Sequence, residues 1–192
     1  IFLEVVIGNS FDSDALKILK KKKNLRLIDS TNFSFSEILK FNSANENILV
    51  QSEDKEIFTK KDFEIVSKKK PTKSQFDDLI FAFNISRYVK SNAIVLATKK
   101  TTVGIGSGQP SRLDSCQIAI DKMKTFTEPP SADIVAASDA FFPFIDGIEK
   151  LVQSGVRAVV QPAGSIRDKE IIKFANKTGT VLIFSKTRHF RH

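Results

Sequence analysis

Residues 134–184 read IVAASDAFFPFIDGIEKLVQSGVRAVVQPAGSIRDKEIIKFANKTGTVLIF. Three short apolar segments of this stretch favour buried β-strands, at 134–137, 158–161 and 181–184. The segments between them, 145–154 and 167–177, favour helices. Strand and helix therefore alternate, which predicts an α/β domain with helices on both faces of its sheet.

The alternation continues upstream. Apolar side chains with helical spacing predict an amphipathic helix over 73–89, with Thr72 as its N-cap. Strands at 93–97 and 102–105, joined by a turn, and a helix from near Ser111 follow. Nearer the N-terminus we expect a strand, a helix, a strand, an Asn/Ser-rich loop, a short strand and a charged stretch, at 1–7, 13–22, 24–29, 30–46, 48–51 and 52–71.

Composition places the chain among ordinary globular proteins. Its 192 residues are 41% apolar and 27% charged, enough for one compact domain of fair size or two small ones. A lone cysteine, Cys116, excludes an internal disulfide and a multi-cysteine zinc site. Nothing else in the sequence demands a metal, and no metal-ligating residues are expected. Apolar runs are too short to span a membrane, and no signal peptide is visible. A reducing, cytoplasmic setting is therefore expected.

The net charge of +8 lies mostly in the C-terminal part of the chain and favours anionic partners. The chain has 17 Phe, one Tyr and no Trp. Because most Phe occupy core-like positions, small phosphates and carboxylates are better candidate ligands than nucleic acid. The lysine runs 20–23 and 68–70 are typical of a solvated helix end and a loop. A nucleic-acid binder stays the weaker alternative.

Three strand-to-helix loops carry the residues that could contact a ligand. The first, GIGSGQPSR at 104–112, matches neither the dinucleotide nor the P-loop pattern, but a helix N-terminus beside Arg112 favours an anion. In the second, SDAFFPFID at 138–146, the Phe residues could wall a flat ring. In the third, QPAGSIRD at 161–168, Ser165 is the expected N-cap. A tight turn, a loop folded on the core and simple capping are the structural alternatives for the three.

Five segments taken together resemble the C-terminal part of the bifunctional purine biosynthesis proteins, which join AICAR transformylase to IMP cyclohydrolase. They are KSNA at 90–93, the loop 104–112, SDAFFPF at 138–144, the loop 161–168 and RHFRH at 188–192. The resemblance runs from residue 1 to 192. It implies a mixed sheet of cytidine-deaminase-like type, with 1–70 as the end of one subdomain plus a connector and 71–192 as a second subdomain.

The resemblance also implies an activity. The family transfers a formyl group from 10-formyltetrahydrofolate to the 5-amino group of AICAR, and it is homodimeric with shared sites. The Lys-His pair that supplies the general base in the family has no counterpart here, because the chain contains no Lys-His dipeptide. Nor is the cyclohydrolase domain expected in these residues. We therefore expect part of an active site, inactive alone. A non-catalytic nucleotide- or folate-binding or dimerisation fragment is the alternative.

Individual roles follow from the resemblance alone. The residues implied to contact AICAR are Glu4, Asn92, Phe141 and Arg188, with Asn92 orienting the carboxamide and formyl groups and Arg188 pairing with the phosphate. The folate side is implied to be lined by Arg112, Asp146, Ser165 and Ile166. His192 is implied to close the site in a supporting role. The resemblance also allows a structural potassium ion near the C-terminus.

Overall fold

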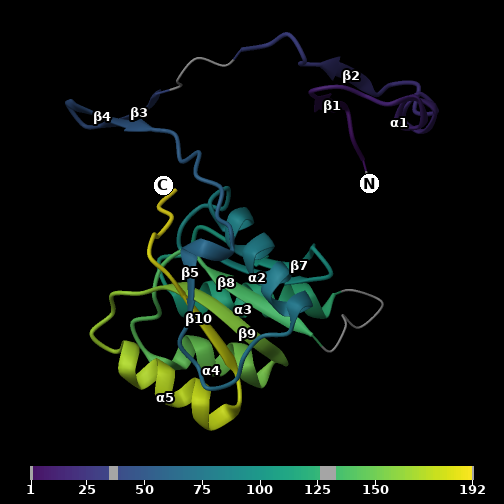
Figure 1. The fold of residues 1–192 in the computed structure, drawn as a ribbon. Coiled ribbons are helices and arrows are strands. Elements are labelled where there is room, and N and C mark those ends of the chain that lie inside the picture. The colour runs from purple at the N-terminus through teal and green to yellow at the C-terminus, as the bar shows by residue number, and fades with distance from the viewer. Residues whose placement is uncertain (1, 35–38, 126–132, 192) are drawn as a thin grey trace. The chain divides into compact units, whose positions relative to one another are not determined.

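A computed structural model describes residues 2–34, 39–125 and 133–191 (Figure 1). The chain forms two compact units, Ile1–Glu53 and Asp54–His192. The division expected at residue 70 concerns the subdomains of a larger protein and stays a prediction. Within the described residues, no helix has both the length and the apolar character needed to cross a bilayer.

The first unit contains two separate pairs of strands. Strand β1 (Val5–Gly8) pairs in parallel with β2 (Arg26–Asp29), and the short helix α1 (Ser13–Leu19) connects them. Strands β3 (Leu39–Ala44) and β4 (Asn47–Ser52) form an antiparallel hairpin. The loop expected over 30–46 is therefore wrong where β3 lies. Its Asn/Ser-rich composition indicated a loop. Asn and Ser nevertheless keep the backbone N–H and C=O groups that pair two strands in a hairpin.

The second unit is a six-stranded sheet in the order β5-β10-β9-β8-β6-β7. Its strands are β5 (Phe63–Ile65), β6 (Ile94–Thr98), β7 (Thr101–Gly106), β8 (Ile134–Ser138), β9 (Val156–Pro162) and β10 (Val181–Ser185). Strands β8, β9 and β10 are parallel, whereas β5, β6 and β7 each run antiparallel to their neighbours. The sheet is thus mixed. A short 3-10 turn, Lys60–Asp62, precedes β5 within the stretch expected only to be charged.

Helices cover both faces of this sheet, as the sequence predicted (Figure 1). Helix α2 (Lys73–Ser86) packs Leu79 and Phe83 against one face. Helices α3 (Arg112–Lys124), α4 (Ile145–Gln153) and α5 (Asp168–Thr178) pack against the other. Alternate residues of each central strand serve the two cores, which is why these strands are apolar throughout.

Two glycines of the 104–112 loop region have a packing role. A Cβ at Gly104 would lie 2.1 Å from the carbonyl oxygen of Ala119, and one at Gly106 would lie 1.9 Å from that of Ser115. Helix α3 therefore lies directly on the backbone of β7, at a distance that only glycine allows. Gly108 has φ +68° and makes the turn itself.

The β6–β7 turn is held from outside the hairpin. Lys99 and Lys100 have φ values of 50° and 53°, in the left-handed region that these residues seldom adopt. Their backbone N–H groups donate to the buried carboxylate of Asp78 on α2, at 2.9 and 2.7 Å. Helix α2 thus supplies the stabilisation that an Asn-Gly turn would find locally.

The single cysteine gives a direct test of the core. Cys116 is buried on α3, and burial raises the pKa of its thiol from 9.0 to about 12. Because the thiolate is the reactive form, we expect Cys116 in the native chain to react with a disulfide reagent at pH 8 roughly 1,000-fold more slowly than in the urea-unfolded chain. Lys169→Cys in a Cys116→Ala background is the exposed control. Rapid labelling of native Cys116 would contradict this account.

Candidate active-site cavity

One edge of the sheet gathers loops from distant parts of the chain. Parallel strands β8, β9 and β10 end there, and antiparallel β6 begins there, because Ile94 pairs with Ser138. Strand β7 also ends there, since Gly106 pairs with Ile94. The segments before β6 and after β7, β8 and β10 therefore meet at the carboxyl edge, where ligands bind in open α/β sheets.

The side-chain amide of Asn92 is fixed by three contacts at this edge. Its Nδ2 donates to the carbonyl oxygens of Gln109 and Pro110, at 2.8 and 3.0 Å, and its Oδ1 accepts from Nη2 of Arg112 at 2.7 Å. The backbone carbonyl of Asn92 accepts from Ser115 Oγ at 2.8 Å. Both amide hydrogens are thus used, and what Asn92 can still offer a ligand is an acceptor position on Oδ1.

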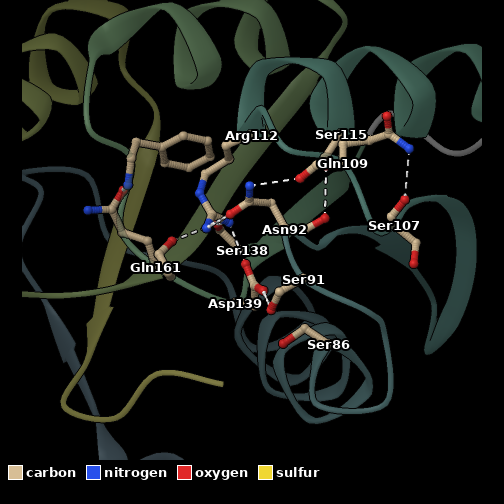
Figure 2. Close-up of polar contacts among 12 residues, drawn as sticks. Ser86, Ser91, Asn92, Ser107, Gln109, Arg112, Ser115, Ser138, Asp139 and Gln161 are labelled. Atoms are coloured by element: carbon tan, nitrogen blue, oxygen red, sulfur yellow. Dashed lines mark hydrogen bonds and ion pairs between the residues drawn. The ribbon is translucent and has the colours of Figure 1, made fainter. Parts of the chain in front are cut away.

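Arg112 forms a buried ion pair with Asp139 at the centre of the polar network (Figure 2). The Arg112 side chain is 9% exposed and that of Asp139 is 1% exposed. The same Nη1 donates to Ser138 Oγ at 2.8 Å, while the second carboxylate oxygen of Asp139 accepts from Ser91 Oγ. The guanidinium is therefore oriented by protein groups before any ligand arrives.

A cavity of about 500 Å³ opens beside this network. Its polar side carries Asn92 and Arg112, and an aromatic wall comes from the loop after β8. The lining residues are Asn92, Pro110, Ser111, Arg112, Leu113, Ala140, Phe141, Phe142, Pro143, Phe144, Asp146, Gly147, Arg188 and Phe190. Phe141 is half-buried, whereas Asp146 and Arg188 are exposed. A flat, anionic small molecule fits this combination of aromatic wall and guanidinium groups.

The cavity brings together five of the nine residues expected at the site: Asn92, Arg112, Phe141, Asp146 and Arg188. Ser165 and Ile166 lie in the loop after β9 and do not line it, and the Ile166 side chain is fully exposed. Glu4 is exposed in the first unit, and His192 lies outside the described residues. The ligand roles of all nine stay predictions.

One expectation about the third loop is wrong. Helix α5 begins at Asp168, so its N-cap is Arg167 rather than Ser165. Ser165 Oγ instead accepts from the backbone N–H of Arg167, at 3.1 Å. The Asp168 carboxylate accepts from the N–H of Gly164, at 2.8 Å. The loop is thus closed by a local Ser turn, which a sequence pattern does not separate from a cap because both use the same hydroxyl.

Sequence reasoning missed three supporting residues. The first is Asp139, the buried partner of Arg112, whose place directly after a buried strand was the available signal. Gln161 is fully buried, and its Oε1 accepts from the N–H of Phe142 at 3.3 Å, which ties the aromatic loop to β9. Phe190 adds a further aromatic side chain to the cavity. Among the described residues, no group of three or more His, Cys, Asp or Glu could hold a metal ion.

Fold and cavity define an α/β protein with a cavity at the carboxyl edge of a mixed sheet. The model of one family, the AICARFT/IMPCHase bienzyme, matches residues 1–122. The chain therefore belongs to the AICARFT/IMPCHase bienzyme family.

The sequence is also similar to curated proteins along its whole length. It is 42% identical over 192 residues to the bifunctional purine biosynthesis protein PurH of Buchnera aphidicola subsp. Schizaphis graminum. It is 45% identical over 197 residues to PurH of Oenococcus oeni, and 43% identical over 191 residues to PurH of Aquifex aeolicus. These alignments cover 100% of this chain but 36%, 38% and 37% of the relatives. The chain thus spans little more than a third of their length.

Proposed function

We propose that this chain supplies part of the site at which a formyl group passes from 10-formyltetrahydrofolate to the 5-amino group of AICAR, in purine biosynthesis. One observation carries the proposal. Asn92, Arg112, Phe141, Asp146 and Arg188 come from separate segments, yet they line one cavity. Three of the four residues expected to contact AICAR are among them. Membership of the AICARFT/IMPCHase bienzyme family supports the same activity.

The surroundings of Arg188 support its proposed contact with a phosphate. Its guanidinium stacks on the ring of Phe190, 4.7 Å from the ring centre, and its side chain is exposed at the cavity. Stacking on an aromatic face holds the plane of a guanidinium and leaves its edge N–H groups available for bidentate phosphate binding. The phosphate of AICAR would occupy this end of the cavity, with its imidazole against Phe141.

The chain's own residues orient the reacting groups in this proposal. In formyl transfer the AICAR amine attacks the formyl carbon and gives a proton to the general base, while the bond from that carbon to folate N10 breaks and N10 takes up a proton. Because both amide hydrogens of Asn92 are engaged, its Oδ1 would accept an N–H of AICAR and so hold the weak nucleophile in place. The general base belongs to the Lys-His pair, which this chain does not contain.

Several finer statements belong to the same proposal. They are a cytidine-deaminase-like arrangement of the sheet, a homodimer with shared sites, a cytoplasmic location and a structural potassium ion near the C-terminus. Asp146, Ser165 and Ile166 would meet the folate with Arg112, and Glu4 and His192 would complete the AICAR side. The exposed position of Ile166 suits contact with a second molecule more than a role in the core.

Titration of AICAR into the chain, followed by calorimetry, tests this proposal. We expect Arg188→Ala to weaken binding about 30-fold, equivalent to about 2 kcal/mol, because a charge-assisted contact is lost. Arg157→Ala removes the same charge from an exposed position on β9 and should leave the affinity unchanged.

A second measurement distinguishes the proposed function from the alternative, a non-catalytic binding or dimerisation fragment. Addition of the upstream part of a family member that carries the Lys-His pair should restore formyl transfer if the chain supplies half of the site. Binding without transfer in that mixture favours the non-catalytic fragment. Absence of AICAR binding, alone and in the mixture, contradicts both the phosphate role of Arg188 and the proposed activity.

A further inference from the structure

The segment after β10 is attached to the fold at one buried side chain. His189 is 2% exposed, whereas the residues on either side of it, Arg188 and Phe190, are exposed and line the cavity. The two cavity residues therefore depend on the position of the residue between them. Sequence reasoning gave His189 no role.

His189 is held from three directions. Its Nδ1 lies 2.6 Å from Oδ2 of Asp54, so the ring donates a hydrogen bond to that carboxylate. The ring packs on Phe83, with centroids 4.7 Å apart, and edge-on to Phe58 at 5.2 Å. Its backbone N–H donates to the carbonyl of Asp139 at 2.9 Å. Among the described residues, Nε2 is buried and has no hydrogen-bond partner.

Asp54 makes this arrangement more than core packing. The imidazole is a polar group within an aromatic cluster, and a hydrophobic side chain would fill that space without an unpartnered nitrogen. The contact with Asp54 is the one side-chain hydrogen bond that the buried ring makes in the described structure. It joins the C-terminal segment to a residue 135 positions earlier. The anchor of the C-terminal segment is therefore polar, whereas core packing alone would be served by an apolar side chain.

We propose that His189 and Asp54 form a latch that positions Arg188 and Phe190 at the cavity. The backbone bond from His189 to Asp139 places this latch beside the carboxylate that orients Arg112. The latch thus sets the separation of the two arginines across the cavity. His189 and Asp54 are positioning residues, and the ligand named in the second test below rests on the proposed function.

Asp54 is the better residue to change because its side chain is 40% exposed. Asp54→Ala removes the acceptor without opening a hole in the core, whereas His189→Leu also alters the aromatic cluster. Asp54→Asn keeps an oxygen that can accept from Nδ1, so it serves as the conservative rescue. Glu53→Ala makes the same charge change one residue away and is the matched control.

Hydrogen exchange of the intact chain tests the latch without any ligand. The reporters are the N–H groups of His189 and Ser91, which donate to Asp139 and to Arg191 respectively. Asp54→Ala should speed their exchange about tenfold and leave the amides of β9 and β10 unchanged. Asp54→Asn and Glu53→Ala should behave as the parent. Unchanged reporters overturn the latch, and so does equal acceleration of all core amides, since that marks a general loss of stability.

AICAR titration tests the positioning role. In a parent chain that binds AICAR, Asp54→Ala should lower the affinity about tenfold, and in an Arg188→Ala background it should cause little further loss. Faster tail exchange with unchanged AICAR affinity overturns the positioning role. A parent that binds AICAR neither alone nor with the upstream part refutes the proposed function instead, while the exchange result still decides the latch.

Discussion

Replacement of Arg112 by methionine is expected to lower the free energy of unfolding by about 3–5 kcal/mol. The change leaves the Asp139 carboxylate, 1% exposed, without its cation, and it also removes donors to Asn92 and Ser138. A buried charge without a partner is among the most destabilising results of a single substitution, because the desolvation cost remains while the attraction is lost. Urea unfolding followed by circular dichroism measures the loss.

Two controls make this result specific to the buried pair. Arg167 pairs with Glu170 at 3.0 Å, but these side chains are 46% and 52% exposed, so Arg167→Met should cost only about 0–1 kcal/mol. The double variant Arg112→Met with Asp139→Leu should recover part of the stability, since no unpaired charge stays buried. If Arg112→Met is no worse than Arg167→Met, the ion pair does not stabilise the fold as described here.

Replacement of Gly106 by alanine is expected to cost about 3 kcal/mol or more and to abolish the proposed AICAR binding. The new Cβ would lie 1.9 Å from the carbonyl oxygen of Ser115, so helix α3 has to move away from β7. That movement breaks the bond from Ser115 Oγ to Asn92 and displaces Arg112 in the first turn of the helix. The same substitution therefore lowers the free energy of unfolding and disrupts the cavity.

Gly179→Ala is the matched control for this change. Gly179 has φ +65°, and a Cβ there meets nothing within 4 Å, so its substitution measures conformational strain alone, at about 1–2 kcal/mol. Thermal unfolding of both variants, with AICAR titration, gives the comparison. A Gly106→Ala variant that is as stable as Gly179→Ala and still binds AICAR would refute the close approach of α3 to β7.

The sequence predicted the central strands of the second unit's sheet because they are buried on both faces, whereas the short edge strand β5 was not expected. Such strands are continuous apolar runs, and the helices between them have a different period, so the two patterns separate readily. Strand β4 was expected at 48–51, but β3 was expected as loop: Leu39, Phe41, Asn42 and Ser43 are exposed, so this strand carries no buried apolar run. The Lys99–Lys100 turn was expected as a turn, but its stabilisation by Asp78 comes from a helix distant in sequence and leaves no local pattern.

The candidate site was predicted as a set of loops, and its internal connections were not. Resemblance indicated Asn92, Arg112 and Arg188, each as a ligand contact. In the structure Arg112 donates a hydrogen bond to Asn92, and Asp139 is the buried counterion of Arg112. A pairing of this kind depends on the reversal of β6 relative to β8, which brings residues before one strand beside residues after the other. No motif spacing encodes that reversal.

The reversed direction of β6 also affects when the cavity can form during synthesis of the chain. The cavity takes one wall from Asn92 and another from Arg188, near the last described residue, so it closes only after almost the whole second unit has been synthesised. Contacts between residues so far apart in sequence form slowly and late, since a long chain loop must first be ordered. A nascent or truncated chain would expose the apolar strands of this sheet but no binding site. Ligand binding would therefore report completion of the fold itself.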